Sequence, residues 1–374
     1  MASRGQPEPG SDTWALTLAF LRFGSDTLGA RALKALAGTP PERLLEALAD
    51  ALAVPPAMRG ERLNQARLRA DLALRQGRAA GLSLLPWFRL GFPELLKEIV
   101  DPPVALWTTG QMECLSRPAI AVVGGRRAAP TGLRVARNLG RDLADAGLVV
   151  VSGLARGIDA AAHQGALDAG GTTIGVLGCG ADAVYPREHD RLAAAMRRSG
   201  AVISEFPPGT PPMAHHFPMR NRIISGLCSA VVVIEASQRS GSLITARMAL
   251  EQGREVLAVP GNVASGQYAG CHALLKDGAA LVETVSDVLG ALGWPSGSAL
   301  SPSQVGNPRI ISKLEAAMAV GEPYTADELA ARTGLAGPEL LAELGALEVA
   351  GTVGRIPGAG FVRVDKSVID GGNG

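Results

Sequence analysis

A short β-branched segment of the chain has two arginines before it and a Gly/Ser turn after it. Arg220 and Arg222 lie before the run Val231–Ile234, and the sequence Ser-Gly-Ser at 240–242 comes after it. The run predicts a strand buried on both faces, with a helix on either side of it. A strand that leads through a Gly/Ser turn into a helix leaves backbone N–H groups free at the positive end of the helix dipole. Because a guanidinium fork can hold two oxygens at once, this segment predicts a phosphate-backbone site.

The other Gly-rich turns do not fit a nucleotide cofactor. The sequence VVGGRRAAPTG places its glycines at positions 124, 125 and 132, which is not the GxGxxG spacing of a dinucleotide site. Such a site also needs an acidic residue at the end of the second strand, where this chain has Ser152 and Gly153. The chain also lacks the GxxxxGKS or GxxxxGKT sequence of many ATPases. We therefore expect no cofactor, whereas Arg126 and Arg127, beside a predicted helix start, favour an anion.

Asp159 and His163 are the nearest approach to a catalytic pair. They stand four residues apart in SGLARGIDAAAH, a spacing that favours a structural pair on one helix over catalysis. Ser240 and Ser242 have no nearby base in the sequence, which a nucleophilic serine needs. The five histidines show no metal-ligand spacing, and the four cysteines form no CxxC sequence. We expect reduced thiols, no metal and no catalytic residue.

Aromatic residues are scarce, at 4% of the chain, so each is informative. Residues 116–290 hold only Tyr185, Phe206, Phe217 and Tyr268. Phe217 lies three residues before Arg220 and is the best candidate to stack on a nucleobase. A position in the protein core is the alternative for Phe217.

The segment 119–290 alternates short apolar runs with Ala-rich stretches that end in Gly. This alternation predicts an α/β fold, with an extended Rossmann-like, doubly wound sheet whose ligands bind beyond the carboxyl ends of the strands. The Gly-rich turns stand at those ends. The candidate strands are Ala119–Val123, Leu148–Ser152, Thr173–Leu177, Ala201–Ser204, Ala230–Glu235, Glu255–Val259 and Ala280–Val282.

Composition shifts divide the rest of the chain. Residues 1–12 predict a disordered tail, and 13–80 predict a helical, SAM-like domain, which is either a packing module or a small nucleic-acid-binding domain. Residues 81–118, broken by prolines, predict a connector with a candidate edge strand at Val104–Trp107. The expected boundaries that follow are a Rossmann-like domain at 119–290, a linker at 291–308 and a winged-helix domain at 309–365.

The winged-helix segment carries the wrong charge for a typical duplex binder. Its second and third predicted helices, 326–333 and 338–350, hold five acidic residues against Arg332 alone. Phosphate would repel them, because affinity in DNA-binding modules depends largely on positive charge. We assign this domain to protein contacts or to stabilisation.

Net charge and hydropathy describe an ordinary globular chain with one basic region. The whole chain carries 36 basic and 35 acidic residues, or +1, whereas residues 116–260 carry 16 and 11, or +5. No apolar run approaches the roughly 18 residues of a membrane span, and the acidic N-terminus does not read as a signal peptide. With its separated cysteines, the chain is expected to be cytoplasmic, without membrane insertion.

Taken together, the motifs resemble the DNA-processing protein family DprA, also called Smf. The matching sequences span roughly residues 115–285: VVGGRR, SGLARGIDAAAH, TIGVLGCGADAVYP, ISEFPPGTPP, FPMRNRIISGL, VVVIEASQRSGSLITARMALEQGREVLAVPG and GCHALLKDGA. The resemblance implies a Rossmann-like domain that binds and protects incoming single-stranded DNA without known catalysis. It also implies a homodimer and the loading of RecA recombinase during natural transformation or recombination.

Carried over by position, the resemblance gives a DNA-binding set and a dimer contact. The dimer contact would include Leu274 and Leu275, for which the domain core is the alternative. The DNA-binding residues would be Gly124, Gly125, Arg126, Ser152, Gly153, Phe217, Arg220, Asn221, Arg222, Gly241, Ser242 and Thr245.

Three features depart from the family pattern. Gly125 stands where the family usually has Ser or Thr, which removes a hydroxyl donor. The sequence PPMAHH before Phe217 lacks the Lys or Arg often found there, and His215 and His216 are weak substitutes. The N-terminal segment has no clear GxG hairpin.

A second reading comes from an enzyme class. The same sheet resembles the lysine-decarboxylase-like nucleotide hydrolases, which cleave nucleoside monophosphates at the glycosidic bond. Those enzymes carry a PGGxGT turn followed by a catalytic Glu. The corresponding turn here is RSGSLIT, with Glu251 further along the chain.

Overall fold

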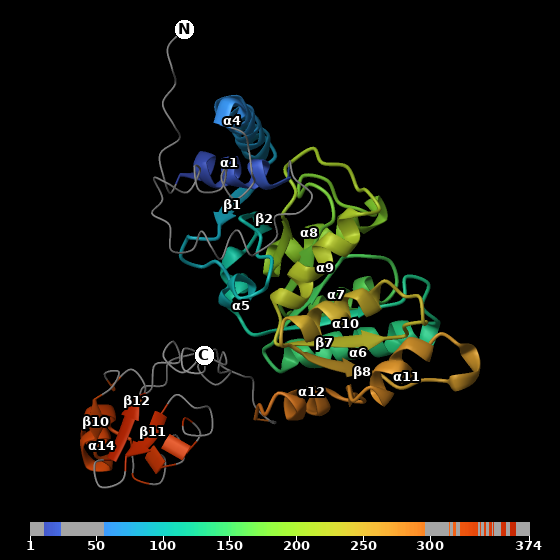
Figure 1. Ribbon diagram of the computed structural model, residues 1–374. Helices are drawn as coiled ribbons and strands as arrows, with labels where there is room; N and C mark the ends of the chain where they lie inside the picture. Colours follow the sequence, from blue (N-terminus) through green and yellow to red (C-terminus); the bar gives the residue numbers. More distant parts are fainter. Residues whose placement is uncertain are drawn as a thin grey trace. The chain divides into compact units, whose positions relative to one another are not determined.

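The computed structural model describes residues 11–23, 56–295 and, with short gaps, 314–363. The chain divides into two compact units, 1–305 and 306–374. Within the described residues, the first unit contains a nine-stranded sheet in the order β1-β2-β6-β5-β4-β3-β7-β8-β9. Figure 1 labels β1 and β2 near one end of this unit and β7 and β8 near the other. The strands are β1 Ser83–Pro86, β2 Ala105–Gly110, β3 Ala119–Gly124, β4 Val149–Ser152, β5 Thr173–Val176, β6 Ala201–Ser204, β7 Ala230–Ile234, β8 Glu255–Ala258 and β9 Ala280–Leu281.

All seven strands predicted from 119 onward are present, with ends that differ by at most one residue. They pair in parallel from β6 to β9, which confirms the α/β, doubly wound class. The helices of this part are α6 Pro130–Asp145, α7 Ile158–Asp168, α8 Asp190–Ser199, α9 His216–Gly226, α10 Ser242–Glu251, α11 Ala269–Lys276 and α12 Val285–Ala291.

Alternate residues of each strand face opposite layers of helices. In β3, Ala121 and Val123 pack with α9, α10 and α11, whereas Ile120 and Val122 pack with α6, α7 and α12. Because both faces are covered, the strands are continuous apolar runs, as expected for a parallel sheet. The close packing of α6 on α7 is assisted by Gly140 and Gly165, where a Cβ would collide with the backbone of the other helix.

The segment predicted as a connector is part of the sheet. β2 pairs antiparallel with β6, and β1 pairs antiparallel with the other side of β2, so the predicted edge strand is an inner strand. Pro86 ends β1 at the sheet edge, where its missing N–H costs no ladder hydrogen bond. Helix α5, Glu94–Lys97, lies in the same segment.

Two helices of the predicted N-terminal domain pack onto this end of the sheet. Helices α1, Asp12–Phe23, and α4, Pro56–Ala79, enclose a small apolar cluster with β1 and β2 that includes Leu16, Ala70 and Trp107. Residues 24–55 of that domain and nearly all of the predicted tail lie outside the described residues. The predicted linker lies mostly outside them as well.

The second unit has the element order of a winged helix. Thr325 caps helix α14, Ala326–Thr333, through a capping box with Glu328, at the predicted boundaries. Strands β11, Val353–Ile356, and β12, Gly360–Arg363, form the wing, and β10, Pro323–Tyr324, adds a third strand to it. A separate apolar cluster around Leu329 and Phe361 holds the described residues of this unit together.

One titratable group of the first unit is sealed in the core between α7 and β5. The ring of His163 is fully buried, with Nδ1 2.6 Å from the hydroxyl of Thr173. That hydroxyl donates its own proton to Val150, so the imidazole Nδ1 is the donor in the first contact. Burial lowers the pKa of His163 to about 3, with His189 and Arg220 adding to the effect.

We predict that His163 makes the protein less stable in mild acid. The unfolded state takes up a proton at His163 near its ordinary pKa of 6.5, whereas the folded state does so only near 3. Between these values the unfolded chain binds more protons, so the free energy of unfolding falls as pH falls, by at most about 1.4 kcal/mol per pH unit. Urea unfolding at several pH values should show a shallower dependence in His163→Asn than in the unchanged protein. Parallel curves would contradict this.

Candidate functional site

A cavity of about 770 Å³ opens where strands β3 and β7 end. These strands are neighbours in the sheet, but the chain leaves them in opposite directions. After β3 it passes to α6 on one face, and after β7 it passes to α10 on the other. The diverging turns leave a crevice, which is the expected ligand position in a doubly wound sheet.

Most of the predicted DNA-binding residues line this cavity. Nine of the twelve do so, although they come from three separate segments of the chain. They are Gly124, Gly125, Arg126, Phe217, Arg220, Asn221, Gly241, Ser242 and Thr245.

The start of α10 forms one wall of the cavity. Gly241 is the N-cap residue, and the hydroxyl of Ser240 accepts a hydrogen bond from the N–H of Ser242, the first residue of the helix. The hydroxyls of Ser240 and Ser242 lie 2.7 Å apart and hydrogen-bond to each other, while Thr245 lines the cavity one turn further on. The N–H groups of residues 242–244 already have acceptors at Ser240 and Gly241, so this wall offers an anion its hydroxyl groups and the positive end of the helix dipole.

Arg220 lies in the wall of the cavity and is almost completely buried, at 4% exposure. Its Nη1 donates to the carbonyl of Val176 over 2.7 Å. Burial lowers its pKa to about 10, with Arg126 also lowering it and Asp159 opposing the shift. The guanidinium is therefore still charged at neutral pH, and it is held rigidly by the sheet.

Two carboxylates that the sequence did not predict in the site, Asp159 and Glu235, also line the cavity. Asp159 accepts hydrogen bonds from the backbone N–H groups of Gly153 and Ala155. Burial raises the pKa of Asp159, an effect that Arg220 and these N–H groups oppose. The predicted pairing of Asp159 with His163 is wrong, because Asp159 bonds the turn before its helix and His163 bonds Thr173.

Glu235 occupies the start of helix α6. Its Oε1 accepts a hydrogen bond from the N–H of Ala129, the N-cap residue of α6, at 2.6 Å. The backbone of Glu235 is left-handed, with φ of 50°, an unusual conformation for a residue with a side chain. An internal carboxylate thus sits where the sequence favoured an external anion.

The structure places Phe217 between the two roles considered for it. It is partly buried and lines the cavity. The guanidinium of Arg126 lies over its ring, 5.3 Å from the centroid, at a distance typical of a cation–π contact. Phe217 is therefore accessible from the cavity while being fixed by its neighbours.

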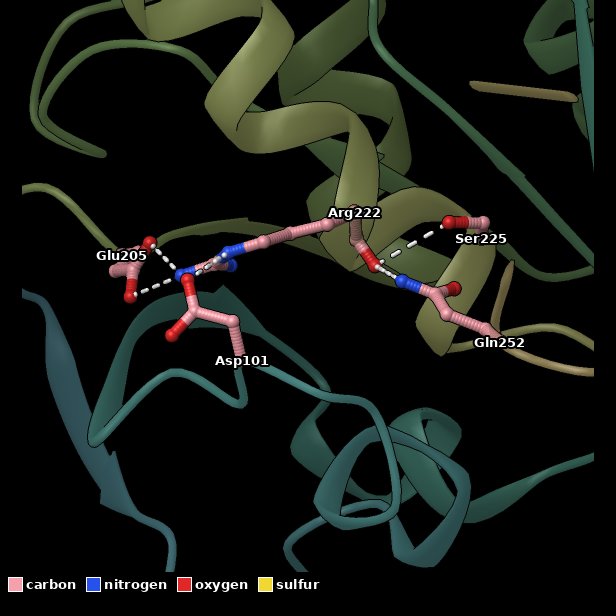
Figure 2. A network of polar contacts seen from close by, with 5 residues as sticks. All are labelled: Asp101, Glu205, Arg222, Ser225 and Gln252. Carbon is pink, nitrogen blue, oxygen red and sulfur yellow. Dashed lines mark hydrogen bonds and ion pairs between the residues drawn. The ribbon is translucent and has the colours of Figure 1, made fainter. Parts of the chain in front are cut away.

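Arg222 does not line the cavity, contrary to its predicted place in the DNA-binding set. Its Nη2 donates to both oxygens of Glu205 at 2.6 Å, and its Nε donates to Asp101 at 3.0 Å (Figure 2). Residues two apart on a helix point in different directions, so Arg220 and Arg222 cannot both face one site. The same rule, applied to the helix predicted from the sequence, would have shown that only one of the two arginines can face the site.

Ser152 and Gly153 do not line the cavity either. The hydroxyl of buried Ser152 donates to the carbonyl of Val122 in the neighbouring strand. A Cβ at Gly153 would collide with the guanidinium of Arg220. Gly153 thus makes room for Arg220. Ser152 and Gly153 therefore support the residues that line the cavity without lining it themselves.

The predicted dimer residues Leu274 and Leu275 are partly buried on α11. Both pack against the core cluster beneath that helix. The core alternative therefore accounts for part of each side chain.

Comparisons with known proteins match two parts of this chain. A family model described as DNA recombination-mediator protein A matches residues 84–293. The chain belongs to that family. A second model, the DprA winged helix domain, matches residues 309–359 and agrees with the predicted C-terminal domain.

Relatives of the DNA recombination-mediator protein A family resemble this chain in sequence and in fold. Protein Smf of Escherichia coli is 43% identical over 74% of this chain and 76% of its own length. DNA processing protein DprA of Streptococcus pneumoniae is 47% identical over 53% and 70%. The X-ray structure of DprA from S. pneumoniae superposes with a TM-score of 0.68 at 37% identity, over 76% of this chain and 98% of that one.

A further structure, of DNA processing protein A from Helicobacter pylori, concerns its single-stranded DNA binding mode. It covers 56% of this chain and 95% of its own, with a TM-score of 0.51 and 28% identity. Membership of the DNA recombination-mediator protein A family thus makes this chain a DNA-processing protein.

The geometry gives no support to the nucleotide-hydrolase alternative. Glu251 is the last residue of α10, about 13 Å along the helix from Ser242, and it does not line the cavity.

In the part of the chain that the structure describes, no cluster of three or more His, Cys, Asp or Glu residues could hold a metal ion. Among the same residues, no helix is both long and apolar enough to span a membrane.

We predict that Arg222→Ala lowers the free energy of unfolding more than it lowers the affinity for a ligand in the cavity. It would leave Glu205, at 6% exposure, without its buried cation, and breaking such a pair costs about 3–5 kcal/mol. Urea unfolding measures this loss. Arg247→Ala, at an exposed arginine of α10, is the matched control and should change stability by less than about 0.5 kcal/mol. A stable Arg222→Ala protein with reduced affinity for nucleic acid would return Arg222 to the site.

Proposed function

We propose that this chain binds single-stranded DNA in the cavity at the ends of β3 and β7. The observation that carries the proposal is that, among the described residues, three arginines of the cavity have no carboxylate partner. Arg126, Arg127 and Arg239 line the cavity, and within the described structure no carboxylate lies within ion-pair distance of them. The two carboxylates of the cavity are bonded to backbone N–H groups instead. Cationic side chains are thus left for phosphate.

The shape of the site favours a single strand over a duplex. The cations lie in turns at the strand ends and not along a protruding helix that could enter a major groove. A single strand can bend into such a cavity and bring its unpaired bases to Phe217. The single-stranded DNA binding described for the H. pylori relative supports the same assignment.

We propose further that the protein acts on DNA without catalysis. The paired hydroxyls of Ser240 and Ser242 bond each other, and no histidine is among the residues that line the cavity. A nucleophilic serine without a base is weak. The role that fits is protection of the bound strand.

The finer steps rest on the family resemblance alone. The protein would form a homodimer in the cytoplasm and load RecA recombinase onto the bound strand during natural transformation or recombination. Light scattering should give twice the chain mass at micromolar concentration. RecA should assemble faster on strands coated with single-strand-binding protein when this protein is added. A monomer, or unchanged RecA assembly, would contradict these two steps separately.

The central prediction concerns affinity and its salt dependence. Single strands should bind at least about tenfold more tightly than duplexes of the same length, a difference of about 1.4 kcal/mol. Arg126→Ala should weaken binding to all sequences alike and flatten the log–log salt dependence by about 0.7, the loss of one phosphate contact to a single strand. Fluorescence anisotropy over a range of salt concentrations measures both.

Arg141→Ala provides the control for that experiment. Arg141 is exposed on α6, about 16 Å along the helix from its start, and does not line the cavity. Its replacement should leave both affinity and salt slope unchanged. Equal binding of single strands and duplexes, or equal effects of the two substitutions, would refute the proposed site.

A further inference from the structure

Tyr185 is an exposed aromatic residue beside the cavity, and none of the assignments above uses it. It lies in the turn between β5 and α8, and its side chain is 42% exposed. Its ring centroid is 5.8 Å from that of Phe217, with the two planes inclined at 42°. Within the described residues, no protein group hydrogen-bonds its hydroxyl. Tyr185 thus extends the aromatic surface of Phe217 out of the cavity toward solvent.

Phe217 by itself offers a base limited space. Arg126 lies over its ring, and the backbone of Gly178 packs so closely that a Cβ there would come within 3.0 Å of the ring. Together with Tyr185, these neighbours enclose the ring on several sides. A base that enters the cavity therefore meets a partly covered Phe217, whereas Tyr185 is open.

A purely structural tyrosine in this protein looks different. Tyr268 is only 7% exposed, and its ring packs directly on Gly261, where a Cβ would overlap it. The contrast indicates that Tyr185 does not fill space in the core. An exposed ring beside cationic side chains and a second aromatic ring matches the surfaces on which single-stranded nucleic acids stack.

We propose that Tyr185 is a nucleobase-stacking site, with Phe217 and Arg126 behind it as support. This inference rests on the proposed binding of single-stranded DNA in the cavity. A strand whose phosphates contact Arg126 and the start of α10 leaves the cavity past Tyr185, and one of its bases stacks on the exposed ring. Stacking is tolerant of sequence, because every base has a π face.

The test separates loss of a base contact from loss of a phosphate contact. Binding of an oligothymidine and of an abasic strand of equal length and charge is measured for the unchanged protein, Tyr185→Phe, Tyr185→Ala and Tyr185→Leu. Tyr185→Ala should bind the oligothymidine about fivefold to 150-fold more weakly and the abasic strand as well as the unchanged protein does. Tyr185→Phe should keep full affinity for both strands.

Tyr185→Leu keeps an apolar side chain without a ring, so it carries the test if the alanine variant is unstable. Its salt slope should equal that of the unchanged protein, because no phosphate contact is lost. Equal oligothymidine affinity in all four proteins would overturn the proposal, and so would equal losses on both strands. Failure of the unchanged protein to bind either strand would instead refute the proposed function.

Discussion

The parallel pairing of β3 with β7 is the constraint on which the site depends. It places two strand ends side by side, and the chain then leaves them toward opposite faces of the sheet. The crevice between the two turns exists because neither helix can cross it. Residues almost a hundred positions apart, such as Arg126 and Phe217, come into contact only because this pairing brings their segments together.

The second feature is the way in which buried charge is distributed. Asp159 and Glu235 lie in the same cavity as the arginines, and one oxygen of each is bonded to backbone N–H groups. The turn before α7 and the start of α6 thus fix the positions of the two acids. The cationic character of the cavity depends on its arginines, which outnumber the two carboxylates by four to two.

Arg220 and Arg222 show how different two arginines of one helix can be. Both are buried, but Arg222 is paired with Glu205 and Asp101, whereas Arg220 bonds a single carbonyl and faces the cavity. Arg222 fixes α9 between the β6 end and the segment around Asp101, and α9 then presents Phe217, Arg220 and Asn221. Arg222 thus holds α9 in place, and Arg220 on the same helix is available to a ligand in the cavity.

Local patterns in the sequence determined the strands, the turns and the family. Apolar runs bounded by Gly specify the seven parallel strands, because a strand buried on both faces is mostly apolar and any buried polar side chain in it needs a hydrogen-bond partner. The pattern of apolar and polar residues could not show which side chains contact one another. Arg222 met an acid 121 residues away, Glu235 reached the start of α6, and the supposed connector joined the sheet. These outcomes depend on long-range packing and on the need to pair buried charge, and only the tertiary structure determines them.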